Sequence, residues 1–229
     1  MDFAKFEEKI NIYFKDKSIL KQAFTHRSFL NENRGSGLEH NERLEFLGDA
    51  VLELVITDHL YQKYPSKPEG ELTAFRSALV NAITLSDSAS KIGVNDFLLL
   101  SKGEAKDTGR ARQYILANTF EAIIGAIYVD QGYDKSKEFI ASQLFALVDN
   151  MVSKGLWIDA KSRFQELAQE KVGITPVYKT IKEMGPDHNK QFTVGLYLAA
   201  DLVIEGSGKS KQEAEQEAAR RALEKNGWQ

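Results

Sequence analysis

Hydrophobic and polar positions along residues 1–150 follow the spacing of helices. Apolar residues recur at helical intervals, and alternating β-branched residues are scarce. Two polar stretches interrupt this pattern: residues 64–70 contain two prolines and a glycine, and residues 101–109 contain two glycines. Because proline and glycine break helices, we expect both stretches to be loops with helices on either side.

After residue 153 the pattern changes to a mixture of helix and strand. Residues 159–171 predict a helix, with Asp159 or Ser162 as its N-cap. Three runs of strand-forming residues follow, and a last helix has a stripe of alanines on one face and Gly227 just after its end, where a C-cap is expected. The predicted strands are residues 177–183, 191–199 and 202–205, and the predicted last helix is residues 210–225.

The order α-β-β-β-α is typical of a small α+β domain. We therefore divide the chain into a helical domain at residues 1–152, a linker at residues 153–158 and a second domain at residues 159–229.

Composition places the chain among ordinary globular proteins. Of 229 residues, 42% are hydrophobic and 28% are charged, and the net charge is −3. The absence of cysteine excludes disulfides, thiolate zinc sites and a cysteine nucleophile, and it suits a reducing cytoplasm. The first residues lack an apolar signal-peptide core, and no stretch approaches the ~20 apolar residues of a membrane span. We therefore expect a cytoplasmic protein without a membrane partner.

The second domain has no excess of positive charge, since basic and acidic residues are equal in number within residues 159–229. Any surface for nucleic acid must therefore be local, with lysines gathered on one face. Gly208, Lys209 and Ser210 match the end of a nucleotide-binding P-loop, but that motif requires glycine where this chain has Val203. We expect no nucleotide cofactor.

Four acidic residues gather on one face of a predicted helix. With ~100° per residue, Glu42, Glu45, Asp49 and Glu53 fall within an arc of about 80°. Like charges this close repel one another, and a bound divalent cation is one reason to keep them together, because hard cations prefer carboxylate oxygens. The alternative is a solvated acidic face, the usual meaning of an acidic run and the better one for Glu53.

A second segment of the sequence supports the reading in which a cation is bound. Residues 115–128 form a predicted helix that is apolar nearly all round and should be buried, yet it carries Asn118 and Glu121 on one face. A buried glutamate without a partner is costly. A cation held between the two helices would account for both the acidic face and Glu121.

These segments resemble the bacterial ribonuclease III family. Residues 40–50 read HNERLEFLGDA, which is similar to the family signature, and residues 23–29 and 109–112 agree with it. Residues 159–229 resemble a double-stranded RNA-binding domain throughout. The resemblance implies an all-α catalytic domain with the ribonuclease III endonuclease fold, followed by a small α-β-β-β-α domain that binds double-stranded RNA.

The resemblance also implies functional residues. Metal ligands fall on Glu45, Asp49, Asn118 and Glu121, with Asp49 and Glu121 the catalytic residues and Mg²⁺ the cofactor, for which Mn²⁺ is a possible substitute. RNA contacts or positions along the RNA path fall on Glu42, Glu69, Arg76, Gln165, Glu166, His188, Lys209 and Lys211. For Arg76, a phosphate contact and a local ion pair are equally good readings. Phe46 resembles the aromatic residue that packs into the partner subunit of a homodimer.

Two positions depart from the family pattern. The family usually has aspartate where this chain has Asn118, whose amide oxygen still ligates a hard cation but carries no charge. Asn118 is a tolerated natural variant, an introduced change that traps substrate, or the mark of a protein that binds RNA without cutting it. We favour the first reading, because the other matched positions are intact. Gln212 replaces a common lysine, which should weaken RNA binding without abolishing it.

The expected function is Mg²⁺-dependent hydrolysis of double-stranded RNA, leaving 5′-phosphates and short 3′ overhangs, in the processing of ribosomal precursors and the processing or decay of messenger RNA. The alternative is a binding protein that holds duplex RNA without cleaving it.

Overall fold

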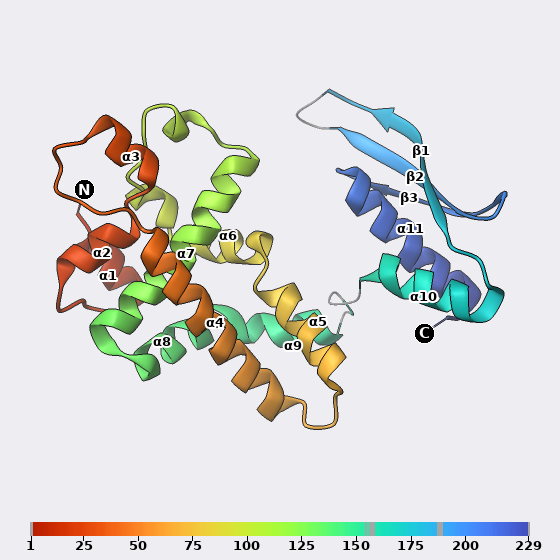
Figure 1. Cartoon of the computed structure of the whole chain (residues 1–229), viewed down its shortest axis with the longest axis horizontal. Helices are drawn as coiled ribbons and strands as arrows, with labels where there is room; N and C mark the ends of the chain where they lie inside the picture. Colours follow the sequence, from red (N-terminus) through yellow and green to blue (C-terminus); the bar gives the residue numbers. More distant parts are fainter. Residues whose placement is uncertain (1, 154, 156–158, 187–189, 229) are drawn as a thin grey trace. The chain divides into compact units, whose positions relative to one another are not determined.

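The computed structural model describes residues 2–153, 155, 159–186 and 190–228 (Figure 1). His188, which is a predicted RNA contact, lies outside these described residues. The chain forms two compact units, Met1–Trp157 and Ile158–Gln229. No helix among the described residues is long and apolar enough to cross a membrane.

The first unit is built almost entirely of helices, as the sequence predicts. In chain order they are α1 (Ala4–Ile10), α2 (Lys17–Ala23), α3 (Arg27–Glu32), α4 (Glu42–Lys63), α5 (Glu69–Leu79), α6 (Ala82–Lys91), the 3₁₀ turns η1 (Val94–Phe97) and η2 (Glu104–Lys106), α7 (Arg110–Gln131), α8 (Tyr133–Ile140), the π-helical turn η3 (Ala141–Phe145) and α9 (Ala146–Ser153). The first predicted loop lies between α4 and α5. The second lies between η1 and α7 and contains η2, a turn that the glycine pattern did not predict.

Helices α4 and α7 pack against each other in the middle of this unit (Figure 1). Their contact depends on two glycines. A Cβ atom on Gly48 of α4 would lie 1.8 Å from the carbonyl oxygen of Glu121, and one on Gly125 of α7 would lie 2.1 Å from the carbonyl oxygen of Leu44. Since no larger residue fits at either position, the two backbones meet at a distance that only glycine permits.

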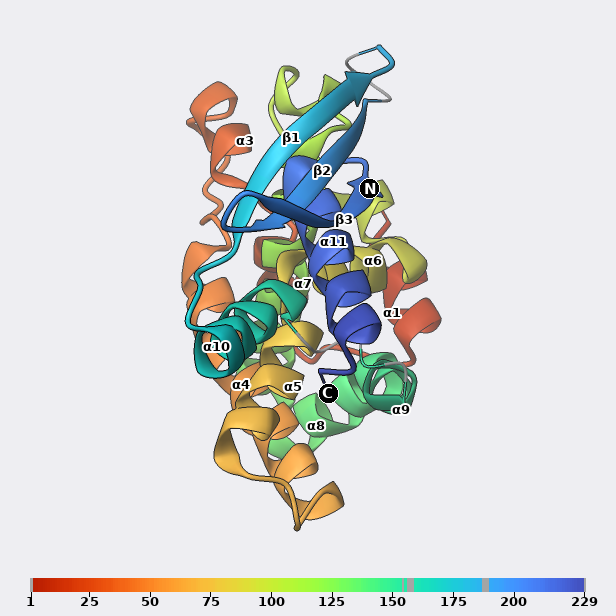
Figure 2. The ribbon, with the colours of Figure 1, turned by 90° about the vertical axis from the view of Figure 1, so that its right-hand side faces the viewer.

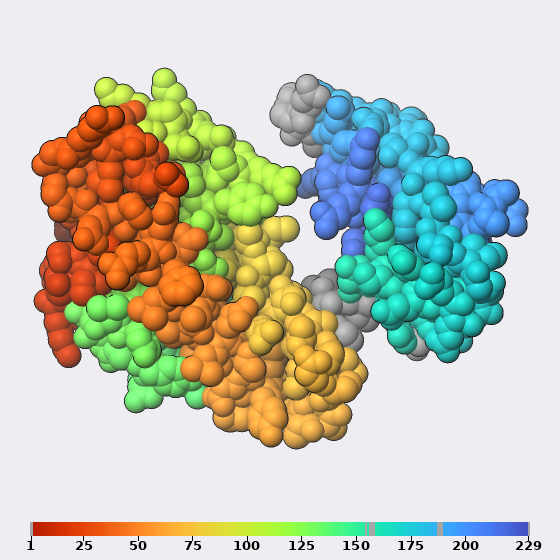
Figure 3. All heavy atoms as spheres, viewed as in Figure 1, coloured from red at the N-terminus to blue at the C-terminus, as the bar shows by residue number. Residues whose placement is uncertain are grey.

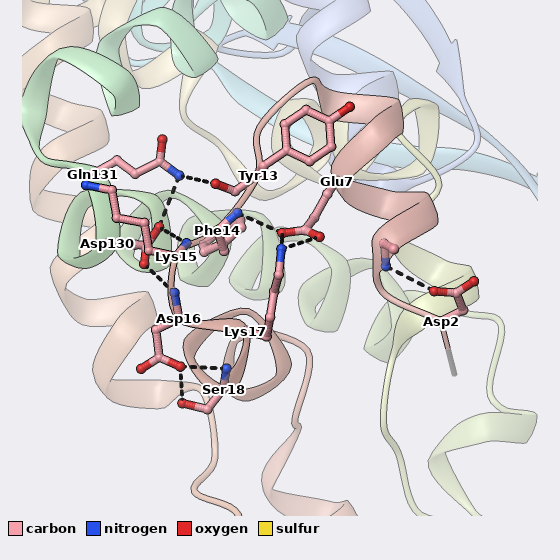
Figure 4. A network of polar contacts seen from close by, with 11 residues as sticks. Asp2, Glu7, Tyr13, Phe14, Lys15, Asp16, Lys17, Ser18, Asp130 and Gln131 are labelled. Atoms are coloured by element: carbon pink, nitrogen blue, oxygen red, sulfur yellow. Dashed lines mark hydrogen bonds and ion pairs between the residues drawn. The ribbon is translucent and has the colours of Figure 1, made fainter.

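The chain before α2 is tied to the end of α7 by polar contacts (Figure 4). The carboxylate of Asp130 accepts hydrogen bonds from the backbone N–H groups of Lys15 and Asp16, both at 2.9 Å. Glu7, with 2% of its surface exposed, accepts from the N–H of Phe14 at 2.7 Å and pairs with Lys17. A buried carboxylate is tolerated here because each of its oxygens has a donor.

The second unit has the predicted order α-β-β-β-α. Helix α10 (Ala160–Val172) precedes an antiparallel sheet of β1 (Val177–Met184), β2 (Gln191–Leu198) and β3 (Asp201–Gly208), and α11 (Lys211–Asn226) follows (Figure 2). The alanine stripe of α11 packs with Phe164 of α10 and Leu196 of β2 in one core. Asp159, one of the two predicted N-caps, caps α10 by accepting from the N–H of Ser162, and Gly227 ends α11 with φ of 63° as predicted.

Four predicted strand boundaries are wrong. Strand β1 continues to Met184, one residue beyond its predicted end, and β3 begins at Asp201, one residue before its predicted start. Strand β2 ends at Leu198, because Ala199 turns into the left-handed region with φ of 54°. Strand β3 continues through Gly208 and does not stop at residue 205, so residues 206–208 pair with β2 and do not open the last helix. Gly206 permits this, because a Cβ atom there would lie 2.2 Å from the backbone nitrogen of Ala218 on α11.

Candidate active site and RNA-binding surface

The crossing of α4 and α7 brings the predicted metal ligands together. Glu45 and Asp49 lie on either side of Gly48 along α4, and Gly48 lies directly against the backbone of Glu121. Burial and the charges of Asp49 and Glu45 together raise the pKa of Glu121 from 4.5 to about 8. The carboxyl group of Glu121 therefore shares one electrostatic environment with both acids of α4.

The two acids of α4 have raised pKa values as well. Burial is the largest cause for Glu45, the neighbouring charges of Glu42 and Asp49 add to it, and a hydrogen bond from the side chain of Asn118 opposes it. For Asp49, burial and the charge of Glu53 raise the pKa. Each group is thus held in a field that disfavours its charged form and that a cation would relieve.

The side chains at the crossing are suited to a hard cation, because their three carboxylates and one amide oxygen are the ligand types that Mg²⁺ takes. Among the described residues, however, no group of three or more His, Cys, Asp or Glu side chains is arranged to hold a metal ion.

Glu42 lies beside this group but has partners of its own. Its carboxylate is 3.3 Å from the guanidinium of Arg27 and 3.7 Å from the ring of His40. Its charge nevertheless reaches Glu45, as the pKa of Glu45 shows.

Glu69 and Arg76 of α5 line a separate hollow of about 410 Å³ with Tyr61 of α4. Arg76 donates to the hydroxyl of Thr57 at 3.0 Å, and Glu69 accepts from the hydroxyl of Thr73 at 2.9 Å. No hydrogen bond or ion pair within the described part of the chain joins either residue to the acids at the crossing. The phosphate contact of Arg76 therefore stays a prediction.

The predicted RNA contacts of the second unit that fall on described residues are exposed. Gln165 and Glu166 lie on the outer face of α10, and Lys209 and Lys211 lie at the start of α11. Lys211 has a partner that sequence reasoning missed, the carboxylate of Glu183 on β1 at 2.8 Å. No pattern predicts this pair, because the two residues come together only through the sheet.

Sequence reasoning also missed the close helix contact at Gly48 and Gly125. Both stand inside helical patterns, where glycine costs about 1 kcal/mol relative to alanine and therefore calls for a packing reason. That signal was present in the sequence, but it indicates a close contact without naming the partner.

Comparisons with known proteins agree with this architecture. Residues 16–148 match the ribonuclease-III-like family, and residues 160–226 match the double-stranded RNA binding motif. Ribonuclease 3 of Natranaerobius thermophilus is 45% identical over 98% of this chain and 96% of its own length, and ribonuclease 3 of Borreliella burgdorferi is 44% identical over 96% of this chain and 89% of its own.

A solved structure resembles the first unit. The nuclease domain of ribonuclease III from Campylobacter jejuni, which has a region involved in dimer formation, superposes with a TM-score of 0.56. It is 38% identical and covers 62% of this chain and 98% of its own.

A helical nuclease domain followed by a double-stranded RNA-binding domain defines an endoribonuclease that acts on duplex RNA. The chain belongs to the ribonuclease III family.

Proposed function

We propose that this protein is a Mg²⁺-dependent enzyme that cuts both strands of duplex RNA and leaves 5′-phosphates and short 3′ overhangs, with Mn²⁺ able to replace Mg²⁺. Its expected substrates in the cytoplasm are ribosomal precursors and structured messenger RNAs. The observation that carries the proposal is the convergence of Glu45 and Asp49 of α4 with Asn118 and Glu121 of α7 at a crossing fixed by glycine.

A bound Mg²⁺ would lower the pKa of a water nucleophile and stabilise charge on the leaving oxygen. The chain's own part is to provide oxygen ligands in a partly buried site. Glu121 and Asp49 supply charge from two different helices, and Glu45 supplies a third carboxylate. Asn118 supplies a neutral oxygen, which leaves the site with one negative charge fewer than an aspartate would.

We also propose that the enzyme is a homodimer formed through α4. Phe46, Leu54 and Tyr61 share one face of this helix and have exposed fractions of 81%, 58% and 72%. In the space-filling view the residues of α4, in orange, lie at the surface of the first unit (Figure 3). An apolar stripe of this kind on a single chain is typical of a covered interface.

The stripe is suited to a two-fold axis. Two copies of α4 packed antiparallel about Leu54 would place Phe46 of each copy opposite Tyr61 of the other, since the two residues are nearly equidistant from Leu54. Tyr61 lines the hollow that also contains Glu69. Phe46 of one copy would fill that hollow, and Glu69 of the second copy would approach the acids of the first.

The decisive experiment is cleavage of a long, end-labelled RNA duplex with Mg²⁺, with Mn²⁺ and with chelator. We expect metal-dependent cuts on both strands by the natural chain and a loss of at least 100-fold in rate for Glu121→Gln. Tight binding without cutting would support the non-cleaving alternative, and recovery of cutting by Asn118→Asp would then identify Asn118 as the cause. Accumulation of uncut ribosomal precursors in cells that lack the protein would test its cellular role.

A further inference from the structure

Arg110 lies on the same face of α7 as the predicted metal ligands. Counting ~100° per residue, Tyr114, Asn118 and Glu121 fall within about 80° of Arg110 around the helix. At ~1.5 Å per residue, Arg110 is about 12 Å from Asn118 along the helix axis. A nucleic-acid strand that reaches the acids along this face would pass Arg110.

Arg110 is held in place by an aromatic ring. Its Nη2 donates to the hydroxyl of Tyr114 at 3.1 Å, and its guanidinium carbon lies 5.7 Å from the centre of the same ring. Tyr114 is 47% exposed, and Arg110 is exposed as well. The ring lies close enough to stabilise the positive charge, and a single hydrogen bond uses only one of the five N–H donors, so most donors remain available to a ligand.

Two other arginines of the first unit are bound to groups of the protein itself. Arg112 donates to the backbone carbonyls of Glu104 at 2.8 Å and Asp107 at 3.1 Å, and Arg27 pairs with the carboxylate of Glu42 at 3.3 Å. In the part of the chain that the structure describes, no carboxylate lies within ion-pair distance of Arg110. Its positive charge is therefore not compensated by an acid.

An uncompensated arginine has a clear use beside an acidic site. The carboxylates at the α4–α7 crossing repel the phosphates of an approaching RNA strand, and a planar guanidinium matches a phosphate with two parallel hydrogen bonds. We propose that Arg110 binds a backbone phosphate of the RNA a few nucleotides from the bond that is cut. Tyr114 is a positioning residue that acts through Arg110. This inference rests on the proposed function, because it assigns a substrate contact of the same site.

The test is steady-state cleavage of a duplex by the full chain, together with duplex affinity measured in chelator at several salt concentrations. For Arg110→Gln we expect KM to rise about 5- to 10-fold with little change in kcat, and the slope of log affinity against log salt to fall by about one. Arg110→Lys should keep that slope and recover only part of KM, because lysine lacks the planar fork. Lys5→Gln removes the same charge from α1 and should change neither quantity.

The role of Tyr114 is tested by a double-mutant cycle. Tyr114→Leu should raise KM in the natural chain and add nothing in the Arg110→Gln background. An equal effect in both backgrounds would show that Tyr114 acts independently and would overturn the positioning role. If Arg110→Gln matches Lys5→Gln in KM and in salt dependence, the phosphate contact is wrong. If the natural chain binds duplex but never cuts it, the proposed function fails, and the salt dependence in chelator still decides the role of Arg110.

Discussion

Glu121 should destabilise the metal-free protein, and its replacement by glutamine should show this. The carboxyl has a pKa of about 8 in the folded chain, against its ordinary value of 4.5. Between pH 4.5 and about pH 8 the carboxyl of Glu121 is therefore protonated in the folded state and ionised in the unfolded state. Stability falls as pH rises through this window, and the loss is absent below pH 4.5 and complete above about pH 8.

The size of the effect follows from the shift. At ~1.4 kcal/mol per pKa unit, the full shift corresponds to an upper limit of about 5 kcal/mol in alkaline solution and about 3 kcal/mol at pH 7. Glu121 is partly exposed, so solvent screening reduces these figures. We expect metal-free Glu121→Gln to be more stable than the natural chain by about 1–2 kcal/mol at pH 8 and equally stable at pH 4.5.

Urea unfolding of the first unit in chelator, followed by circular dichroism from pH 4.5 to 9, measures this difference. Exposed Glu8 of α1 provides the control, since Glu8→Gln should follow the natural chain at every pH. Added Mg²⁺ should stabilise the natural chain more than Glu121→Gln, because a ligand stabilises the state that binds it. A stability difference that does not vary with pH would refute the reasoning, and so would a glutamine variant that is less stable at pH 8.

Three further predictions concern packing, assembly and RNA binding. Gly48→Ala should destabilise the first unit by about 2 kcal/mol or more in urea unfolding, because its Cβ would overlap the backbone of Glu121, whereas Gly70→Ala, with nothing within 4 Å, should be neutral or stabilising. Phe46→Ala should leave the unfolding of one subunit unchanged but weaken the dimer at least 10-fold in sedimentation equilibrium, and an unchanged dimer would exclude Phe46 from the interface. Lys211→Gln should lower the salt slope of duplex binding by about one, and an unchanged slope would show that Glu183 keeps Lys211 from the phosphates.

Element types followed from the sequence because local signals agree with the final packing. Asp159 and Gly227 mark helix ends through their own side-chain and backbone preferences: Gly227 acts where predicted, and Asp159 is one of the two N-caps that the sequence allowed. The end of β3 was predicted wrongly because it depends on tertiary packing and has no local signal. Gly206 has a weak strand preference, and its place in the sheet depends on how closely α11 approaches, which only the assembled domain defines.

In the candidate site, too, local signals were predictable from the sequence and contacts between distant segments were not. Helical periodicity was enough to place Glu45 with Asp49, and Asn118 with Glu121, because each pair lies on one helix. That α4 and α7 face each other was inferred from the cost of burying Glu121, and the structure gives the contact that brings it about, the backbone approach at Gly48 and Gly125. Pairs formed across the sheet, such as Lys211 with Glu183, have no such local signal.

The structure shows that Asn118 has a second effect besides its lack of charge. Its side chain donates a hydrogen bond to Glu45 and so lowers the pKa of a carboxyl that burial and neighbouring acids raise. An ionised aspartate at this position has no donor to offer and would add a further negative charge beside Glu45 and Glu121. Asparagine therefore relieves repulsion in the metal-free site while it gives up attraction for the cation. Because both effects act on the same carboxylates, stability in chelator and Mg²⁺ affinity should change in opposite directions at this residue.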